Sequence, residues 1–387
     1  MNKKKILFII DSLTCGGAEK SLVSLLPLLN TDKYELYIWM RQQGGAFAPL
    51  LPNNVNVVSE PKYNAFESLK LQLGKVGFSL RLRWNRLIHK REHLAETLWK
   101  SQGWAMKVPE GNWDVAIAYQ QGVPTFLVAE KFHGCKKMAW VNVDVFKAGY
   151  NIAYNSKFYR KMDYICPVSD QLHGMMDARM AEFSDKYNTI WDVINPDVTR
   201  KLANETVQRL KGKDDEYVFV TTGRLVPPKG HDIAVEAAAE LKRKGVKFKW
   251  YFIGEGSERP NIEKLIRQNN VQDVVFLLGM HTNPYAFMQQ ADVYVQTSKF
   301  EGFGMTIAEA KILGKPIVST NFEVICNQIT HEKNGLIAEM NGKSVADNIY
   351  RIITNSNLRD SIVAEVKAEK YTRHLTEAQK VEALIDC

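Results

Sequence analysis

The chain has 387 residues, with 51 Lys and Arg against 43 Asp and Glu, a net charge of +8 and 45% hydrophobic residues. This length predicts two domains, and the composition excludes a wholly disordered chain. No apolar run approaches the roughly 18–20 residues that a membrane-spanning helix needs, so an integral membrane protein is excluded as well.

The N-terminus has three lysines followed by an apolar run that ends at Asp11 after five residues. A secretory signal peptide needs an apolar core of about 7–15 residues, so we expect a buried strand here instead. The five cysteines lie far apart and form no C-x-x-C pair. This spacing predicts neither a disulfide framework nor a cysteine-based zinc site, and it favours a reducing cytoplasm.

Short apolar runs alternate with helical patterns along the chain, which is typical of βαβ units and parallel sheets. In the first half, strands are predicted at residues 5–10, 34–40, 115–119, 137–143, 164–168 and 189–194. In the second half, strands are predicted at residues 217–222, 248–253, 274–278, 293–297 and 316–319, with helices at 233–244 and 259–268. The sequence therefore predicts an α/β protein of two Rossmann-like domains that face each other across a cleft.

The predicted domains are residues 1–196 and 217–367. The polar stretch 197–216 is predicted to be the linker between them. The last residues, 368–387, are predicted to form a helix that can cross back to the first domain.

Residues 64–107 interrupt the pattern with nine Lys and Arg, three Glu and many Leu and Trp. Such a basic amphipathic stretch suits an anionic membrane surface, which is the preferred interpretation. Helices packed on the first domain with solvated cations are the alternative, and nucleic acid is disfavoured because no binding motif accompanies the charge. Residues 89–93 match H-x-x-E-H, but the two cations inside the motif argue against a zinc site.

The strongest chemical signal is the run from Glu301 to Glu309, which follows the predicted strand at 293–297. Gly302 and Gly304 allow close backbone approach, and a helix that begins near Met305 directs its positive end at a ligand. The two carboxylates can accept hydrogen bonds from sugar hydroxyls. This turn therefore predicts a site for an anionic, hydroxyl-bearing ligand.

Two further loops follow strands. Residues 223–230 place Arg224 and Lys229 after a strand, with two prolines between them that stiffen the loop. Two such cations suit phosphate oxygens. Residues 16–19 begin with two glycines at a helix start, where backbone amides can approach a phosphate, although the full G-x-G-x-x-G fingerprint is absent.

Together these motifs resemble the retaining nucleotide-sugar glycosyltransferases of family 4, which have the GT-B fold. The resemblance spans nearly the whole chain and is densest over residues 223–339. It implies that Arg224 and Lys229 hold the diphosphate of the donor, that Glu301 contacts the transferred sugar and that Glu309 contacts the ribose. The remaining implied donor-binding residues are Gly16, Gly17, Gly223, Met280, His281, Phe303, Gly304, Met305 and Thr306.

One position departs from the family pattern. Many relatives carry a catalytic-site histidine after the strand at 137–143, where this chain has Asn142, with Asp144 two residues further on. Asparagine can hydrogen-bond a hydroxyl but cannot act as a base, whereas Asp144 could do either. Both could instead cap the strand end.

The resemblance predicts a retaining glycosyltransferase on the cytoplasmic face of the membrane. It would transfer a hexose-type sugar from a nucleoside diphosphate, UDP by preference, to a lipid-linked or polysaccharide acceptor in capsule- or exopolysaccharide-type synthesis. No Asp-x-Asp occurs in the chain, so metal-independent transfer without a cofactor is expected. A non-catalytic subunit that stabilises a partner transferase and a nucleotide-sugar epimerase are the alternatives.

Overall fold

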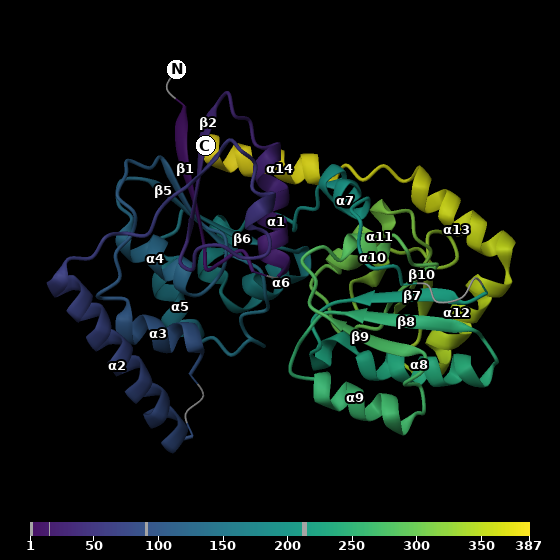
Figure 1. Ribbon diagram of the computed structural model, residues 1–387. Coiled ribbons are helices and arrows are strands. Elements are labelled where there is room, and N and C mark those ends of the chain that lie inside the picture. Colours follow the sequence, from purple (N-terminus) through teal and green to yellow (C-terminus); the bar gives the residue numbers. More distant parts are fainter. Residues whose placement is uncertain (1–2, 15, 90–91, 211–214) are drawn as a thin grey trace. The chain divides into compact units, whose positions relative to one another are not determined.

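The computed structural model describes residues 3–14, 16–89, 92–210 and 215–387. The chain divides into two compact units (Figure 1). The first consists of Met1–Val193 together with Arg373–Cys387, and the second is Ile194–Thr372. Each unit contains one six-stranded parallel sheet with helices packed around it, which confirms the predicted α/β fold class.

The sheet of the first unit has the strand order β3-β2-β1-β4-β5-β6. Its central strands β1 and β4 are apolar on both faces and buried except at Lys4 and Lys5, as expected for parallel strands with helices on each side. The strands are β1 (Lys4–Ile10), β2 (Tyr34–Met40), β3 (Val55–Val57), β4 (Val115–Ala118), β5 (Lys136–Val141) and β6 (Tyr164–Pro167).

The helices of the first unit begin in large part at capping side chains, such as Asn64 before α2 and Ser169 before α6. They are α1 (Gly17–Leu25), α2 (Ala65–Leu87), α3 (Leu94–Gln102), α4 (Val123–Lys131), α5 (Ile152–Tyr159), α6 (Asp170–Arg179) and α14 (Arg373–Asp386).

The C-terminal helix α14 packs within the first unit, although it lies more than 170 residues from the rest of that unit in the sequence. Val381 and Ile385 are buried in the core. Lys136 Nζ donates to the carbonyl oxygens of Leu384 and Ile385 at 2.9 and 3.0 Å, which neutralises the carboxyl end of the helix dipole.

The sheet of the second unit has the order β12-β11-β10-β7-β8-β9. Its strands are β7 (Tyr217–Thr222), β8 (Phe248–Ile253), β9 (Val275–Gly279), β10 (Val293–Gln296), β11 (Ile317–Thr320) and β12 (Leu336–Ala338). Its helices are α7 (Pro196–Ala203), α8 (His231–Arg243), α9 (Arg259–Gln268), α10 (Tyr285–Met288), α11 (Met305–Ile312), α12 (Gly342–Thr354) and α13 (Ser356–Ala368).

Three features differ from the sequence-based expectation. Residues 189–194 are buried but form no strand, and the short edge strands β3 and β12 were not predicted. The stretch 197–216 is not a linker throughout, because Asn195 caps α7, which packs within the second unit. Residues 211–214 of the predicted linker lie outside the described residues, as do Lys90 and Arg91 of the H-x-x-E-H match.

Within the described ranges, no helix is both long enough and apolar enough to cross a bilayer.

Candidate functional site

Two loops of the second unit meet where the order of its sheet reverses. The reversal lies between the neighbouring strands β10 and β7. Loops that follow such neighbours run to opposite sides of the sheet and leave a crevice, which is where open α/β sheets bind ligands. The loops here are residues 223–230 after β7 and 297–304 after β10, so the sequence motifs with Lys229 and Glu301 converge at this point.

Lys229 and Glu301 form an ion pair across the two loops. Lys229 Nζ lies 2.6 Å from Glu301 Oε1, and their side chains are only 22% and 10% exposed. Because the pair is largely shielded from water, its charges act on a ligand more strongly than surface charges do. An ammonium group has three N–H donors, so Lys229 keeps two for an anionic ligand.

Further donors converge on the same oxygen of Glu301. Oε1 also accepts from Ser298 Oγ at 2.7 Å and from Gln296 Nε2 at 2.9 Å. The second oxygen, Oε2, receives no donor from the part of the chain that the structure describes. The carboxylate is therefore fixed through one oxygen, and the other can accept a hydrogen bond from a ligand hydroxyl.

Gln296 is oriented in turn by two hydroxyl groups. Its Oε1 accepts from Tyr294 at 2.7 Å and from Thr306 at 3.1 Å. Burial raises the pKa of Tyr294, so its phenol stays protonated and remains a donor. Thr306, predicted to bind the donor, thus helps to position Gln296. Gln296 was missed in the sequence, although a polar residue at the end of an apolar strand is a signal that could have found it.

A glycine permits the close approach of the two loops. Gly230 has φ of 61°, and a Cβ at this position would lie 2.0 Å from the carbonyl oxygen of Thr297. Arg224 lies in the same loop but is exposed, and within the described chain its side chain has no partner. Of the two cations predicted to bind phosphate, only Lys229 is fixed in the network.

The turn before α11 is held by a buried glutamine. Gln328 Nε2 donates to the carbonyl oxygens of Phe303 and Gly304, the latter at 3.1 Å. Gly304 has φ of 82°, and no side chain caps α11 at Met305. The helix start can therefore offer backbone N–H groups and the positive end of its dipole to an anion. The ring of Phe303 is buried, so its side chain is not exposed to a ligand.

Glu309, the second carboxylate of the motif, lies inside the second unit. It is wholly buried, and its Oε1 accepts a hydrogen bond from Tyr285 at 2.9 Å. Burial raises the pKa of Tyr285 well above its usual value. The ribose contact expected of Glu309 stays a prediction. Met280 and His281 follow β9 at the same sheet edge, two strands from β7, and lie outside the Lys229–Glu301 network.

The two candidate residues that follow β5 in the first unit, Asn142 and Asp144, have different surroundings. Asp144 Oδ1 accepts from the backbone N–H groups of Phe146 and Lys147 at 3.0 Å each, so it holds a turn. Both side-chain polar atoms of Asn142 are buried and have no partner within the described chain. Buried amides are nearly always hydrogen-bonded, so Asn142 is the better candidate to bind a ligand. Gly16 and Gly17 begin α1, as predicted from the sequence.

A buried carboxyl group, Asp192, was also missed in the sequence. It lies near Ser21, whose hydroxyl is 3.0 Å from Tyr119 Oη and accepts from the backbone N–H of Val193 at 2.9 Å. Burial and the nearby charge of Glu19 raise the pKa of Asp192 to about 7. Its Oδ1 has no partner in the described part of the chain.

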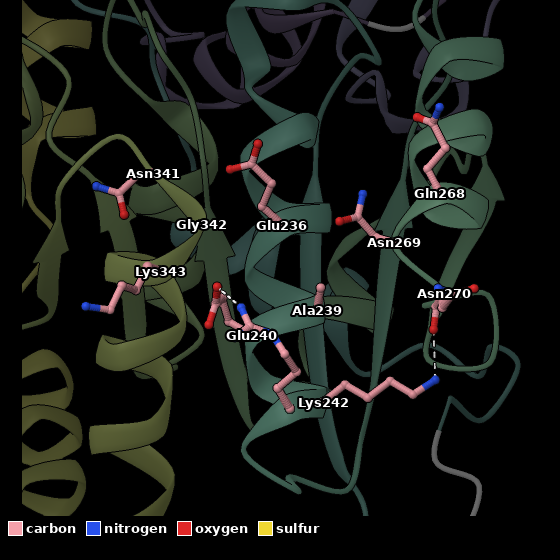
Figure 2. Close-up of a pocket in the computed structure, with 11 residues that line it drawn as sticks. Glu236, Ala239, Glu240, Lys242, Gln268, Asn269, Asn270, Asn341, Gly342 and Lys343 are labelled. Atoms are coloured by element: carbon pink, nitrogen blue, oxygen red, sulfur yellow. Dashed lines mark hydrogen bonds and ion pairs between the residues drawn. The ribbon is translucent and has the colours of Figure 1, made fainter.

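A hollow of about 740 Å³ lies elsewhere, on the outer side of α8 between the end of α9 and the start of α12 (Figure 2). It shares no residue with the two loops. Lys242 and Arg243 at this hollow are paired with Asp273 and Glu240. We therefore do not assign it to the site. The described residues contain no group of three or more His, Cys, Asp or Glu placed to hold a metal ion.

Residues 203–369 match the family model of glycosyl transferases group 1. A solved structure of Anabaena HepE in complex with UDP and glucose superposes with a TM-score of 0.73 at 18% identity, covering 99% of both chains. This likeness establishes the fold. The chain has the GT-B fold.

Several curated proteins that resemble this chain are glycosyltransferases. An uncharacterised glycosyltransferase of Methanocaldococcus jannaschii is 26% identical over 225 residues, which is 54% of this chain and 55% of the relative. The chain spans about half or less of several such relatives, down to 34%. The N-acetylgalactosamine-N,N'-diacetylbacillosaminyl-diphospho-undecaprenol 4-alpha-N-acetylgalactosaminyltransferase of Campylobacter jejuni is 24% identical over 371 residues, 94% of each chain.

Proposed function

We propose that this GT-B chain is a retaining glycosyltransferase of family 4. It transfers a sugar from a UDP-linked donor to a lipid-linked or polysaccharide acceptor in cell-surface glycan synthesis, at the cytoplasmic face of a membrane. The observation that carries the proposal is the shielded Lys229–Glu301 pair at the switch point of the second sheet. The first unit is assigned to the acceptor.

The pair supplies the two chemical properties that such a donor requires. Cleavage of the anomeric C–O bond leaves a nucleoside diphosphate, on which negative charge grows in the transition state. The two free N–H donors of Lys229 and the start of α11 stabilise that charge, and Arg224 adds a second cation. Glu301 Oε2 accepts from a hydroxyl of the transferred sugar and so orients the reacting carbon.

In this proposal the fixed cation does the work that a divalent metal does in other transferases, so transfer proceeds without metal. Glu309 is assigned to the ribose through a rearrangement of its Tyr285 contact. Retention of configuration, the family 4 assignment and the choice of UDP rest on the sequence resemblance. The Anabaena structure is a complex with UDP and glucose, and the Campylobacter relative is named for a diphospho-undecaprenol acceptor, so both support a UDP donor and a lipid-diphosphate acceptor.

The test combines donor binding with product analysis. We expect one UDP-sugar in a panel of nucleotide sugars to raise the melting temperature, and the same donor to be hydrolysed or transferred in the presence of EDTA. Sugar release with retained configuration supports the proposal. An isolated chain that binds no donor, or a conversion of one nucleotide sugar into its epimer, would contradict it.

A further inference from the structure

Helix α2 exposes an apolar stripe along its whole length. The stripe consists of side chains that recur every three or four residues and therefore share one helix face. Each is more than half exposed: Phe66, Leu69, Leu73, Val76, Leu80, Trp84 and Leu87. A folded chain rarely leaves so continuous an apolar surface in water unless the surface binds something.

A different, polar face of α2 fastens it to the first unit. Only Gly74 and Asn85 of the helix are buried. Asn85 Nδ2 donates to Glu92 Oε2 at 3.0 Å, and Arg81 bridges both oxygens of the same carboxylate at 2.8 and 3.1 Å. A Cβ at Gly74 would lie 3.1 Å from the carbonyl oxygen of Ser101 in α3, so the helices are close there.

An ordinary surface helix buries its apolar side. In α2 the attached face contributes two half-buried apolar side chains, Leu71 and Phe78, whereas the longer apolar stripe stays exposed. The Glu92 carboxylate also accepts from Lys100 of α3 at 2.6 Å, and these cations hold its pKa well below its usual value. Because the carboxylate stays ionised, the polar contacts keep α2 in place without using the apolar stripe. The stripe is thus presented outward by a fixed support.

The charge along α2 identifies what can cover the stripe. The helix carries Lys70, Lys75, Arg81, Arg83 and Arg86, and its one acidic residue is Glu67. Glu67 is already engaged by the N–H of Asn64 and by Lys107. A second copy of α2 would bring two sets of cations together without compensating carboxylates. An anionic lipid surface supplies both the negative charge and an apolar layer.

We propose that α2 lies in the boundary between headgroups and acyl chains of an anionic phospholipid bilayer, with its stripe from Phe66 to Leu87 inserted. A helix of 23 residues is about 34 Å long, which would suffice to cross the roughly 30 Å hydrocarbon core. Its five cations prevent this, because they would have to enter the acyl layer, so the helix lies along the membrane. Trp84 and Phe66 anchor the two ends, and Lys70 and Arg83 reach lipid phosphates. This inference goes beyond the donor site and does not depend on its chemistry.

The experiment is vesicle flotation with the full chain and two variants. Both variants replace a leucine of α2 with glutamate, and they differ only in which leucine is replaced. Leu80→Glu places a charge in the stripe, whereas Leu82→Glu makes the same charge change on the same helix outside it. Vesicles contain equal parts of phosphatidylcholine and phosphatidylglycerol. We expect Leu80→Glu to weaken binding at least about tenfold and Leu82→Glu less than about threefold. Thermal melts verify that both variants are folded.

Vesicles of phosphatidylcholine alone should bind at least about tenfold more weakly than the mixed vesicles. Equal binding to both vesicle types, equal loss in both variants, or a dimer that Leu80→Glu dissociates in the absence of vesicle binding would overturn the proposal. Lys229→Ala should bind vesicles normally, and Leu80→Glu should still bind UDP. Failure of the donor assignment and failure of the membrane assignment can therefore be told apart.

Discussion

The two units share one strand order, yet the carboxyl edges of their sheets carry different chemistry. Where the strand order of the second sheet reverses, Lys229 pairs with Glu301, and Gln296 and Ser298 donate hydrogen bonds to the same carboxylate. After β5 of the first sheet, Asn142 has an amide with no partner in the described chain, and Asp144 holds a turn. One edge is thus organised before a ligand arrives, whereas the other leaves a polar group unsatisfied.

This difference indicates a division of roles within one fold. A site that stabilises developing charge gains from groups already in place, since reorganisation then costs nothing during the reaction. A site that recognises an acceptor can leave a buried amide open until the acceptor binds. Strand order alone distinguishes neither role, because function lies in the loops.

The largest expected effect is on the organised edge. Glu301→Gln removes the carboxylate charge but keeps its shape, so we expect kcat to fall about 10²–10³-fold. UDP affinity should change less than about threefold, because the diphosphate contacts belong to Lys229. Glu323→Gln, an exposed carboxylate in the same unit, is the control. Full activity of Glu301→Gln would remove this carboxylate from the reaction.

A pH-dependent stability distinguishes the first unit. Asp192 has a pKa of about 7 when folded and an ordinary value of 3.8, so between these pH values the folded chain holds a proton that the unfolded chain has released. Its contribution to stability is therefore lost as pH rises from 4 to 7. Asp192→Asn removes this loss.

The measurement is the unfolding free energy of Asp192→Asn and of the original chain, from urea melts at pH 4 and at pH 7. Between these pH values we expect the variant to gain roughly 2–4 kcal/mol of stability relative to the original chain. A difference that does not vary with pH would show that Asp192 titrates normally in the folded chain.

The approach of the two loops in the second unit can be broken at Gly230. Gly230→Ala places a Cβ against the carbonyl of Thr297, so we expect a loss of roughly 2–3 kcal/mol in unfolding free energy. Gly245 also has a left-handed backbone, but no atom lies within 4 Å of its Cβ position. Gly245→Ala should therefore cost only about 1 kcal/mol in the same chemical melts. Equal costs would mean that the close approach contributes nothing.

The smallest effect is expected after β5. Asn142→Ala removes an unsatisfied amide, so folding stability should stay the same or rise by up to about 1 kcal/mol. Transfer to the acceptor should fall about tenfold, while hydrolysis of the donor should remain. If Asn142→Ala transferred sugar to the acceptor as fast as the original chain, the side-chain amide of Asn142 would have no role in acceptor binding.

Much of the site could be predicted from the sequence because its chemistry lies in loops that follow apolar strands. Lys229 and Glu301 are 72 residues apart, and parallel strand order is what brings their loops together. The sequence could not show that Asp144 holds a turn and Asn142 does not, since that depends on the backbone N–H groups of Phe146 and Lys147.

Other misses have similar causes. Residues 189–194 have the apolar pattern of a strand. A buried segment that forms no hydrogen-bonded ladder with a neighbouring strand has the same pattern, so the sequence does not distinguish the two. The stretch after Asn195 is polar because α7 has one exposed face, and polarity alone suggested a linker. The periodicity of α2 indicates an amphipathic helix, but only the Glu92 contacts reveal that its polar face is the attached one.

The most direct test of the account is the affinity for UDP, measured by isothermal titration calorimetry for Lys229→Ala and for Lys299→Ala. Lys299 lies on the same loop as Glu301 but pairs with Asp232 and not with Glu301, so it is a matched cation outside the network. We predict that Lys229→Ala weakens UDP binding by at least about tenfold and that Lys299→Ala changes it less than about twofold. Equal affinities in the two variants would contradict the assignment of the diphosphate to the Lys229–Glu301 site.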